Sequence, residues 1–204
     1  GYTGADLENV MNEAAIFAAR KNKSKIDMAD IEDANLKVMM GSEKKSKVVT
    51  EKEKKLTAYH EAGHALMSKL LNSKDKVHKI SIVPRGRAGG FTMHRPDEGT
   101  DYSSKGEMLD DIMTLLGGRI AEKLVLEEIS TGASNDIKRA TEVARNMVMR
   151  YGMSDNIGPV CYDDNEEVFI GRDYGHSKIY SDETAYELDK EVKNIINAQY
   201  EKGI

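Results

Sequence analysis

The residues best placed to do chemistry form the run His60-Glu61-Ala62-Gly63-His64, which spells H-E-x-x-H. Positions i and i+4 share one face of a helix, so both imidazoles can bind the same metal ion. Glu61 then lies beside that ion, where its carboxylate can take a proton from metal-bound water. The spacing therefore predicts a zinc peptidase site in which Glu61 is the general base.

The motif falls within a segment that we expect to be one helix, from about residue 51 to about Asn72. Thr50 and Glu53 form a T-x-x-E capping box at its start. Leu56, Tyr59, Gly63, Leu66 and Leu70 recur at helical spacing. Glycine costs roughly 1 kcal/mol relative to alanine inside a helix. We therefore expect another backbone to approach Gly63 closely, or space to lie beside the site.

A catalytic zinc ion needs a third protein ligand and an open position for water. The other histidines are His78, His94 and His176, and none of them belongs to a second helical pair. Cys161 is the one cysteine of the sequence, which excludes a cysteine-rich zinc site. The third ligand is therefore expected to be a carboxylate from another helix.

Asp136 is the leading candidate for this third ligand. Gly132 breaks the chain before it, and Ser134 or Asn135 can cap the helix that follows. Asp136 would then occupy the first turn, where a carboxylate also serves simply to compensate the helix dipole. Glu122 is the competing ligand.

Several runs resemble the FtsH family, whose members are membrane-anchored, ATP-dependent AAA zinc proteases. Five runs resemble the family's peptidase domain: His60 to His64, Gly118 to Glu122, Ser130 to Asp136, Arg145 to Ser154 and Ser181 to Thr184. The opening run, Gly1 to Leu7, resembles the start of the lid subdomain of the family's AAA module. The resemblance covers essentially the whole chain.

The resemblance assigns roles to individual residues. It implies that His60, His64 and Asp136 bind Zn²⁺ and that Glu61 is the general base. Glu122 is then expected to accept a hydrogen bond from a ligating imidazole, since such imidazoles usually donate their other ring N–H to a carboxylate, carbonyl or water.

We expect a mainly α chain: a helical metalloprotease domain with a small β-hairpin, preceded by a short helical AAA lid fragment. The expected domains are part of a lid at 1–40, a charged linker at 41–49 and a zinc peptidase domain at 50–204. In the lid, Thr3 with Asp6 and then Asp27 are expected to start helices that end at about Arg20 and Met40.

In the peptidase domain, alternation predicts a strand at Val77–Val83, a turn at 84–90 and a return strand at 91–94. Ser104 and Glu107 are expected to open a helix to about Leu126, bent at Gly117-Gly118. Further helices are expected at about 135–150 and from about Ser181, after a loop-rich segment at 152–179.

The sequence contains no G-x-x-x-x-G-K-[ST] loop, so ATP and Mg²⁺ are expected only through an AAA core outside it. It contains no apolar stretch of transmembrane length, so the membrane anchor is expected outside it as well. We therefore expect a soluble fragment, lid plus peptidase domain, that lacks a closing C-terminal helical segment.

The formal net charge of −5 gives no basic patch for nucleic acid. The resemblance implies unfolded polypeptide substrates, from misfolded or short-lived membrane and soluble proteins. It also implies a homohexamer at the cytoplasmic face of the bacterial inner membrane. The alternative is a non-catalytic AAA lid and oligomerisation module with a structural metal site, which a fourth ligand such as His94 would favour.

Overall fold

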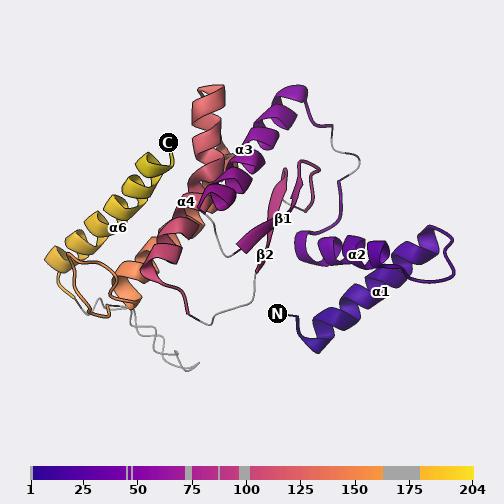
Figure 1. Ribbon diagram of the computed structural model, residues 1–204, viewed down its shortest axis with the longest axis horizontal. Helices are drawn as coiled ribbons and strands as arrows, with labels where there is room; N and C mark the ends of the chain where they lie inside the picture. Colours follow the sequence, from indigo (N-terminus) through magenta and orange to yellow (C-terminus); the bar gives the residue numbers. More distant parts are fainter. Residues whose placement is uncertain are drawn as a thin grey trace. The chain divides into compact units, whose positions relative to one another are not determined.

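The computed structural model describes residues 2–44, 46, 48–71, 75–86, 88–96, 102–162 and 180–204. These residues fall into two compact units, Gly1–Lys54 with Ser81–Phe91 (unit 1) and Lys55–Ile80 with Thr92–Ile204 (unit 2). Most are helical, and one two-stranded antiparallel sheet accompanies the helices (Figure 1). The expected mainly α fold with a small hairpin is confirmed.

Unit 1 is built around the helices α1, Gly4–Arg20, and α2, Met28–Met40. A capping box opens each of them, with Thr3 and Asp27 as the predicted N-cap residues. The two helices pack against each other through a small apolar core of Val10, Ala14 and Ala34 (Figure 1). Their predicted starts and ends are confirmed.

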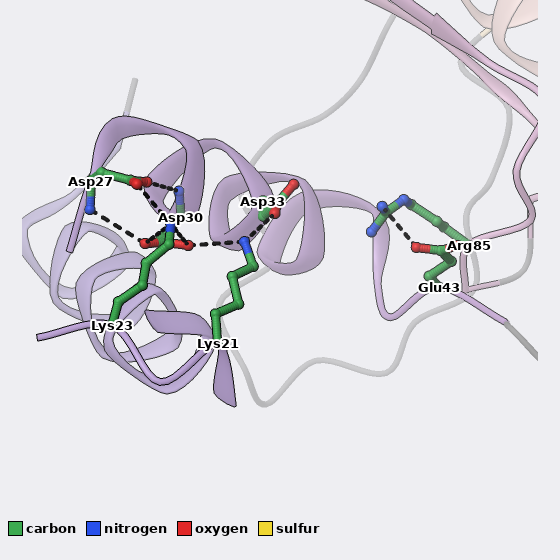
Figure 2. A network of polar contacts seen from close by, with 7 residues as sticks. All are labelled: Lys21, Lys23, Asp27, Asp30, Asp33, Glu43 and Arg85. Atoms are coloured by element: carbon green, nitrogen blue, oxygen red, sulfur yellow. Dashed lines mark hydrogen bonds and ion pairs between the residues drawn. The ribbon is translucent and has the colours of Figure 1, made fainter. Parts of the chain in front are cut away.

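A fully buried carboxylate, Asp30, ties the loop between these helices to α2 (Figure 2). Its oxygens accept hydrogen bonds from Lys21 at 2.9 Å and from Lys23 at 3.0 Å. The hydrogen bond from Lys21, with that from Lys23, outweighs the effect of burial and holds the pKa of Asp30 well below its ordinary value. The negative charge is therefore part of the folded unit 1.

Residues 41–44, at the start of the expected linker, pair with the turn that follows β1. The backbone N–H of Lys44 donates to the carbonyl of Pro84, and the N–H of Gly86 donates to that of Ser42. Glu43 and Arg85 add an ion pair at 3.5 Å (Figure 2). This segment and the turn accordingly belong to the same compact unit.

Unit 2 takes most of helix α3, Glu51–Leu70, which Thr50 and Glu53 cap as predicted. The predicted end at Asn72 lies outside the described residues. The strands are β1, Asp75–Ser81, and β2, Phe91–Pro96. β1 ends two residues before the predicted Val83, because the Ser81 hydroxyl accepts the backbone N–H of Val83 and starts a turn.

Helix α4, Lys105–Ala121, begins at the predicted capping box of Ser104 and continues as a π-helical turn through Glu122–Leu126. Its α-helical pattern runs unbroken through the glycine pair at which we expected a bend. Glu127 then adopts a left-handed backbone with φ +55° and ends the helix.

Helix α5, Ser134–Arg145, is followed by a π-helical turn at Asn146–Arg150, and α6, Asp182–Gly203, begins after the predicted cap Ser181. The prediction that Ser134 or Asn135 caps α5 is wrong, because Ser130 instead caps a preceding 3₁₀ turn, Thr131–Ala133. The expected loop at 152–179 is seen through residue 162; the remainder lies outside the described residues.

The core of unit 2 lies among α4, α5 and α6, which pack side by side (Figure 1). It consists of buried aliphatic residues, among them Ile112, Leu116, Met147, Leu188 and Val192. Leu188 and Val192 contribute to this core from α6. This core fixes α4 and α5, the two helices that carry the partners of α3.

Helices α3 and α4 cross in backbone contact at two glycines. A Cβ added to Gly117 would lie 2.7 Å from the carbonyl oxygen of Gly63, and a Cβ on Gly63 would overlap the backbone of Gly117. No real Cβ tolerates such distances, so both positions must remain glycine. The predicted close approach of another backbone to Gly63 is confirmed.

Gly63→Ala and Gly117→Ala should each lower the free energy of unfolding by at least about 1–3 kcal/mol, because overpacking must push two backbones apart. Urea unfolding followed by circular dichroism measures this. Gly106→Ala, in the first turn of α4, is the control, because its Cβ would meet only Ser104 Oγ at 3.9 Å. Equal stability of the Gly63 and Gly106 variants would contradict a tight crossing.

Asp30→Asn should destabilise α1 and α2 at pH 7. Because the pKa of Asp30 is lowered by folding, its stabilisation is present above its unfolded pKa of about 4 and is lost as pH falls below that value. The difference in the free energy of unfolding between wild type and variant should therefore become smaller in acid. NMR signals of α1 and α2 during urea titration at several pH values measure it.

Asp33→Asn is the matched control, since Asp33 binds Lys21 from a side chain that is 48% exposed. It should cost little at any pH. If the difference in the free energy of unfolding between wild type and Asp30→Asn stays constant down to pH 3, the negative charge of Asp30 does not stabilise the fold.

Candidate metal centre

Helix α3 presents His60 and His64 one turn apart on a single face, as the spacing predicts. Their rings meet edge to face, with centroids 4.7 Å apart, and their Nε2 atoms lie 3.1 Å apart. Both side chains are largely buried, with exposed fractions of 12% and 10%. The two nitrogens therefore point to one small volume beside the helix.

Asp136, in the first turn of α5, brings a carboxylate oxygen to the same point. Its Oδ2 lies 3.3 Å from Nε2 of His60 and 3.5 Å from Nε2 of His64. Ligand atoms about 2.0–2.1 Å from a tetrahedral zinc ion lie about 3.3–3.4 Å from one another. The three atoms thus have the spacing that zinc requires, and in the described part of the chain they form one metal-compatible group.

The contacts of the two Nδ1 atoms determine whether each Nε2 atom carries a proton. Nδ1 of His64 lies 2.8 Å from the carbonyl oxygen of Thr114, and Nδ1 of His60 lies 2.7 Å from Oε1 of Glu122. Because a carbonyl oxygen only accepts, Nδ1 of His64 must donate, which leaves a lone pair on Nε2 of the neutral ring. This is the tautomer in which a histidine ligates a metal through Nε2.

The electrostatics of this group favour a cation. Burial raises the pKa of Asp136, but the hydrogen bonds with His60 and His64 outweigh it, and the pKa lies below its ordinary value. Burial lowers the pKa of His60, and the hydrogen bonds with Asp136 and Glu122 reverse the direction. Three electron-pair donors converge in a largely buried space. A positive ion would stabilise this arrangement, whereas holding the donors together without an ion costs free energy.

Glu122 lies behind His60, on the opposite side of the ring from Asp136. It is fully buried, and besides His60 it binds the backbone N–H of Ser130 at 2.7 Å and the Ser130 hydroxyl at 3.0 Å. Ser130 begins the short segment that leads into α5 and Asp136. One carboxylate therefore connects an imidazole of α3 with the chain that carries Asp136.

Gly118 lies directly against the imidazole ring of His60. A Cβ at this position would lie 2.5 Å from Cε1 of the imidazole and 2.6 Å from its Nδ1. This contact was not predicted from the sequence, although two consecutive glycines inside a helix were the available signal, since each one costs stability. The contact of His64 with the carbonyl of Thr114 left no signal, because any residue supplies a carbonyl.

Glu61, beside the metal-compatible group on α3, is buried, and the hydroxyl of Thr92 in β2 donates to its Oε2 at 2.8 Å. Burial raises the pKa of Glu61 above its ordinary value, and the hydrogen bond from Thr92 opposes this only in part. A raised pKa suits a group that accepts a proton and then gives it up. The sequence analysis did not identify Thr92.

The remaining histidines do not join this group. His78 and His94 lie in β1 and β2 and are not members of the metal-compatible group. His176 lies outside the described residues. Within the described residues, the group therefore offers three ligands, and His94 is not a fourth.

Sequence comparisons match this chain to known proteins. The model of Peptidase family M41 matches residues 47–204, and that of the AAA+ lid domain matches residues 1–33. The chain is 57% identical over 204 residues to the ATP-dependent zinc metalloprotease FtsH of Caldicellulosiruptor bescii, covering 100% of this chain and 33% of that protein.

The protein of the same name from Bacillus subtilis is 48% identical over 205 residues, covering 100% of this chain and 32% of that protein. That from Myxococcus xanthus is 53% identical over 204 residues, with the same two shares. The chain thus spans about a third of the length of the curated relatives that it matches.

Asp136→Asn should weaken zinc binding more than Glu122→Gln does. A direct ligand supplies a bond and the negative charge of the group, whereas loss of a carboxylate that orients an imidazole typically costs about 10- to 100-fold in affinity. Chelator titration of the zinc-loaded variants measures the difference. Circular dichroism must first show that both variants are folded.

The opposite order would overturn this assignment. If Glu122→Gln loses zinc while Asp136→Asn retains it, the two carboxylates exchange roles. Equal affinities for both variants and wild type would show that neither carboxylate contributes to a metal site.

Proposed function

This chain belongs to peptidase family M41, and from that membership we propose that it hydrolyses peptide bonds with zinc as its cofactor. The observation that carries the proposal is the group of His60, His64 and Asp136, whose donor atoms lie 3.1–3.5 Å apart. Glu61 beside them is the proposed general base.

In this proposal His60, His64 and Asp136 hold the zinc ion. Zinc, when bound, supplies a Lewis acid and lowers the pKa of water to about 7. Thr114 and Glu122 keep the two imidazoles in the ligating tautomer through the hydrogen bonds to Nδ1.

Glu61 carries the proton through the reaction. Its carboxylate takes a proton from the attacking water as the new C–O bond forms at the scissile carbonyl. It then gives that proton to the amide nitrogen as the C–N bond breaks, and it returns to the carboxylate form. Burial raises its pKa, which makes the carboxylate a better proton acceptor than an ordinary exposed glutamate.

The alternative is a non-catalytic lid and oligomerisation module with a structural metal site. Structural zinc sites are almost always closed by four protein ligands, whereas catalytic sites use three. The group found in the described residues has three members. Together with the intact Glu61, this supports the peptidase over the structural site.

For the protein of which this chain is a part, we propose an ATP-dependent protease acting on unfolded polypeptides from misfolded or short-lived proteins. The match of residues 1–33 to the AAA+ lid domain and the printed names of the relatives support this. We propose the lid at 1–40, the linker at 41–49 and the peptidase domain at 50–204.

We also propose that this larger protein is a homohexamer anchored at the cytoplasmic face of the bacterial inner membrane. ATP and Mg²⁺ would act through an AAA core outside this sequence. Among the described residues, none of the helices combines the length and the apolar character needed to span a bilayer.

Glu61→Gln should abolish peptide hydrolysis while zinc remains bound, because the amide cannot accept the proton and Glu61 is not among the donor atoms. We expect a loss of kcat of at least about 100-fold, the range of general base catalysis. Cleavage of an unfolded fluorogenic polypeptide by the zinc-loaded chain, with zinc content by elemental analysis, measures both effects.

Glu142→Gln, at an exposed position of α5, is the matched control and should behave as wild type. Hydrolysis at the wild-type rate by Glu61→Gln would refute the assigned base. A zinc-loaded wild-type chain without any peptidase activity would favour the structural alternative.

A further inference from the structure

We propose that Thr92 is the positioning residue for the general base: its hydroxyl holds the Glu61 carboxylate in the orientation that proton transfer needs. This inference rests on the proposed peptidase function and adds a residue to it. Thr92 belongs to β2, whereas Glu61 belongs to α3, so the hydrogen bond connects the sheet to the helix that carries the motif.

The geometry involves two contacts from a single hydroxyl. Oγ1 of Thr92 lies 2.8 Å from Oε2 of Glu61 and 3.1 Å from the backbone carbonyl oxygen of the same residue. A hydroxyl has one hydrogen to donate, and the charged, nearer carboxylate is the stronger acceptor. Thr92 thus holds the carboxylate of Glu61 close to the backbone carbonyl of Glu61.

A glutamate needs such a restraint more than most side chains do. Its flexible side chain loses conformational entropy when it is fixed. Thr92 is suited to fix it, because a β-branched side chain in a strand has a restricted χ1 angle. The donor is therefore rigid where the acceptor is flexible.

The hydrogen bond also distinguishes the two carboxylate oxygens. Oε2 accepts from Thr92, which leaves Oε1 as the oxygen available to take a proton from water. In the described part of the chain, Thr92 is the side-chain donor that the structure gives to this buried carboxylate. Removing the hydroxyl would leave a buried charge without that donor, and such a group moves toward another partner or toward solvent.

The variants Thr92→Val and Thr92→Ser separate the hydroxyl from the shape of the side chain. Valine keeps the shape and loses the donor, whereas serine keeps the donor. We expect Thr92→Val to lower kcat roughly 10- to 100-fold, the effect of losing a hydrogen bond to a charged group, with KM and zinc content unchanged. Thr92→Ser should recover most of the rate.

Thr141→Val is the bystander control, since Thr141 donates to the carbonyl of Ile137 on α5 and should behave as wild type. In the Glu61→Gln background, Thr92→Val should have no further effect on kcat, because the base that it positions is gone. A merely structural role for Thr92 would lower both backgrounds and would not be rescued by serine.

A second measurement does not depend on activity. The ¹³C NMR signal of the Glu61 side-chain carboxyl should shift in zinc-loaded Thr92→Val and stay at the wild-type position in Thr92→Ser. An unchanged signal in Thr92→Val, or an unchanged kcat, would overturn the inference. If the wild-type chain shows no hydrolysis, the proposed function fails, and the NMR signal alone still decides whether Thr92 positions Glu61.

Discussion

The contact between the backbones of α3 and α4 at Gly63 and Gly117 is the constraint on which the candidate site depends. Because the two helices touch there, the same face of α4 reaches the histidines on either side of the crossing. The carbonyl of Thr114 meets His64, and one turn after the crossing Glu122 meets His60. A side chain at the crossing would push the two helices apart and so displace these partners.

Two buried carboxylates, Glu61 and Glu122, and the half-buried carboxylate of Asp136 lie close together, and their neighbours differ. Asp136 faces the two Nε2 atoms, Glu122 faces an Nδ1 atom and the backbone of Ser130, and Glu61 faces the hydroxyl of Thr92. The pKa is lowered for Asp136, which faces two imidazoles, and raised for Glu61, where burial dominates. Residue type alone therefore does not distinguish ligand, orienting group and base.

The features that sequence predicted have causes that lie within a few residues. Capping boxes at Thr3, Thr50 and Ser104 start helices where we expected them, and the i, i+4 spacing of His60 and His64 is a property of any helix. The cap before Asp136 was wrong, since the choice of Ser130 depends on a buried Glu122 that lies eight residues earlier. Thr92 was missed because its partner is 31 residues away and a lone threonine in a strand has no distinguishing pattern.

The site is thus assembled in steps of increasing range, and this ties metal binding to folding. Two of the proposed ligands come from one helix, but the third comes from α5, which its packing against α4 and the Glu122–Ser130 contact hold in place. An unfolded chain cannot bring these groups together, so an ion bound to all three stabilises the native unit by RT ln(1 + [L]/Kd), about 2.7 kcal/mol at 100 times Kd. By the same linkage, the free energy that the glycine crossing and the buried core supply is part of the affinity for the metal, although neither touches it. The glycines therefore act on the chemistry through the position of α4, and the ion in turn would hold together α3 and α5, the two helices that supply its ligands.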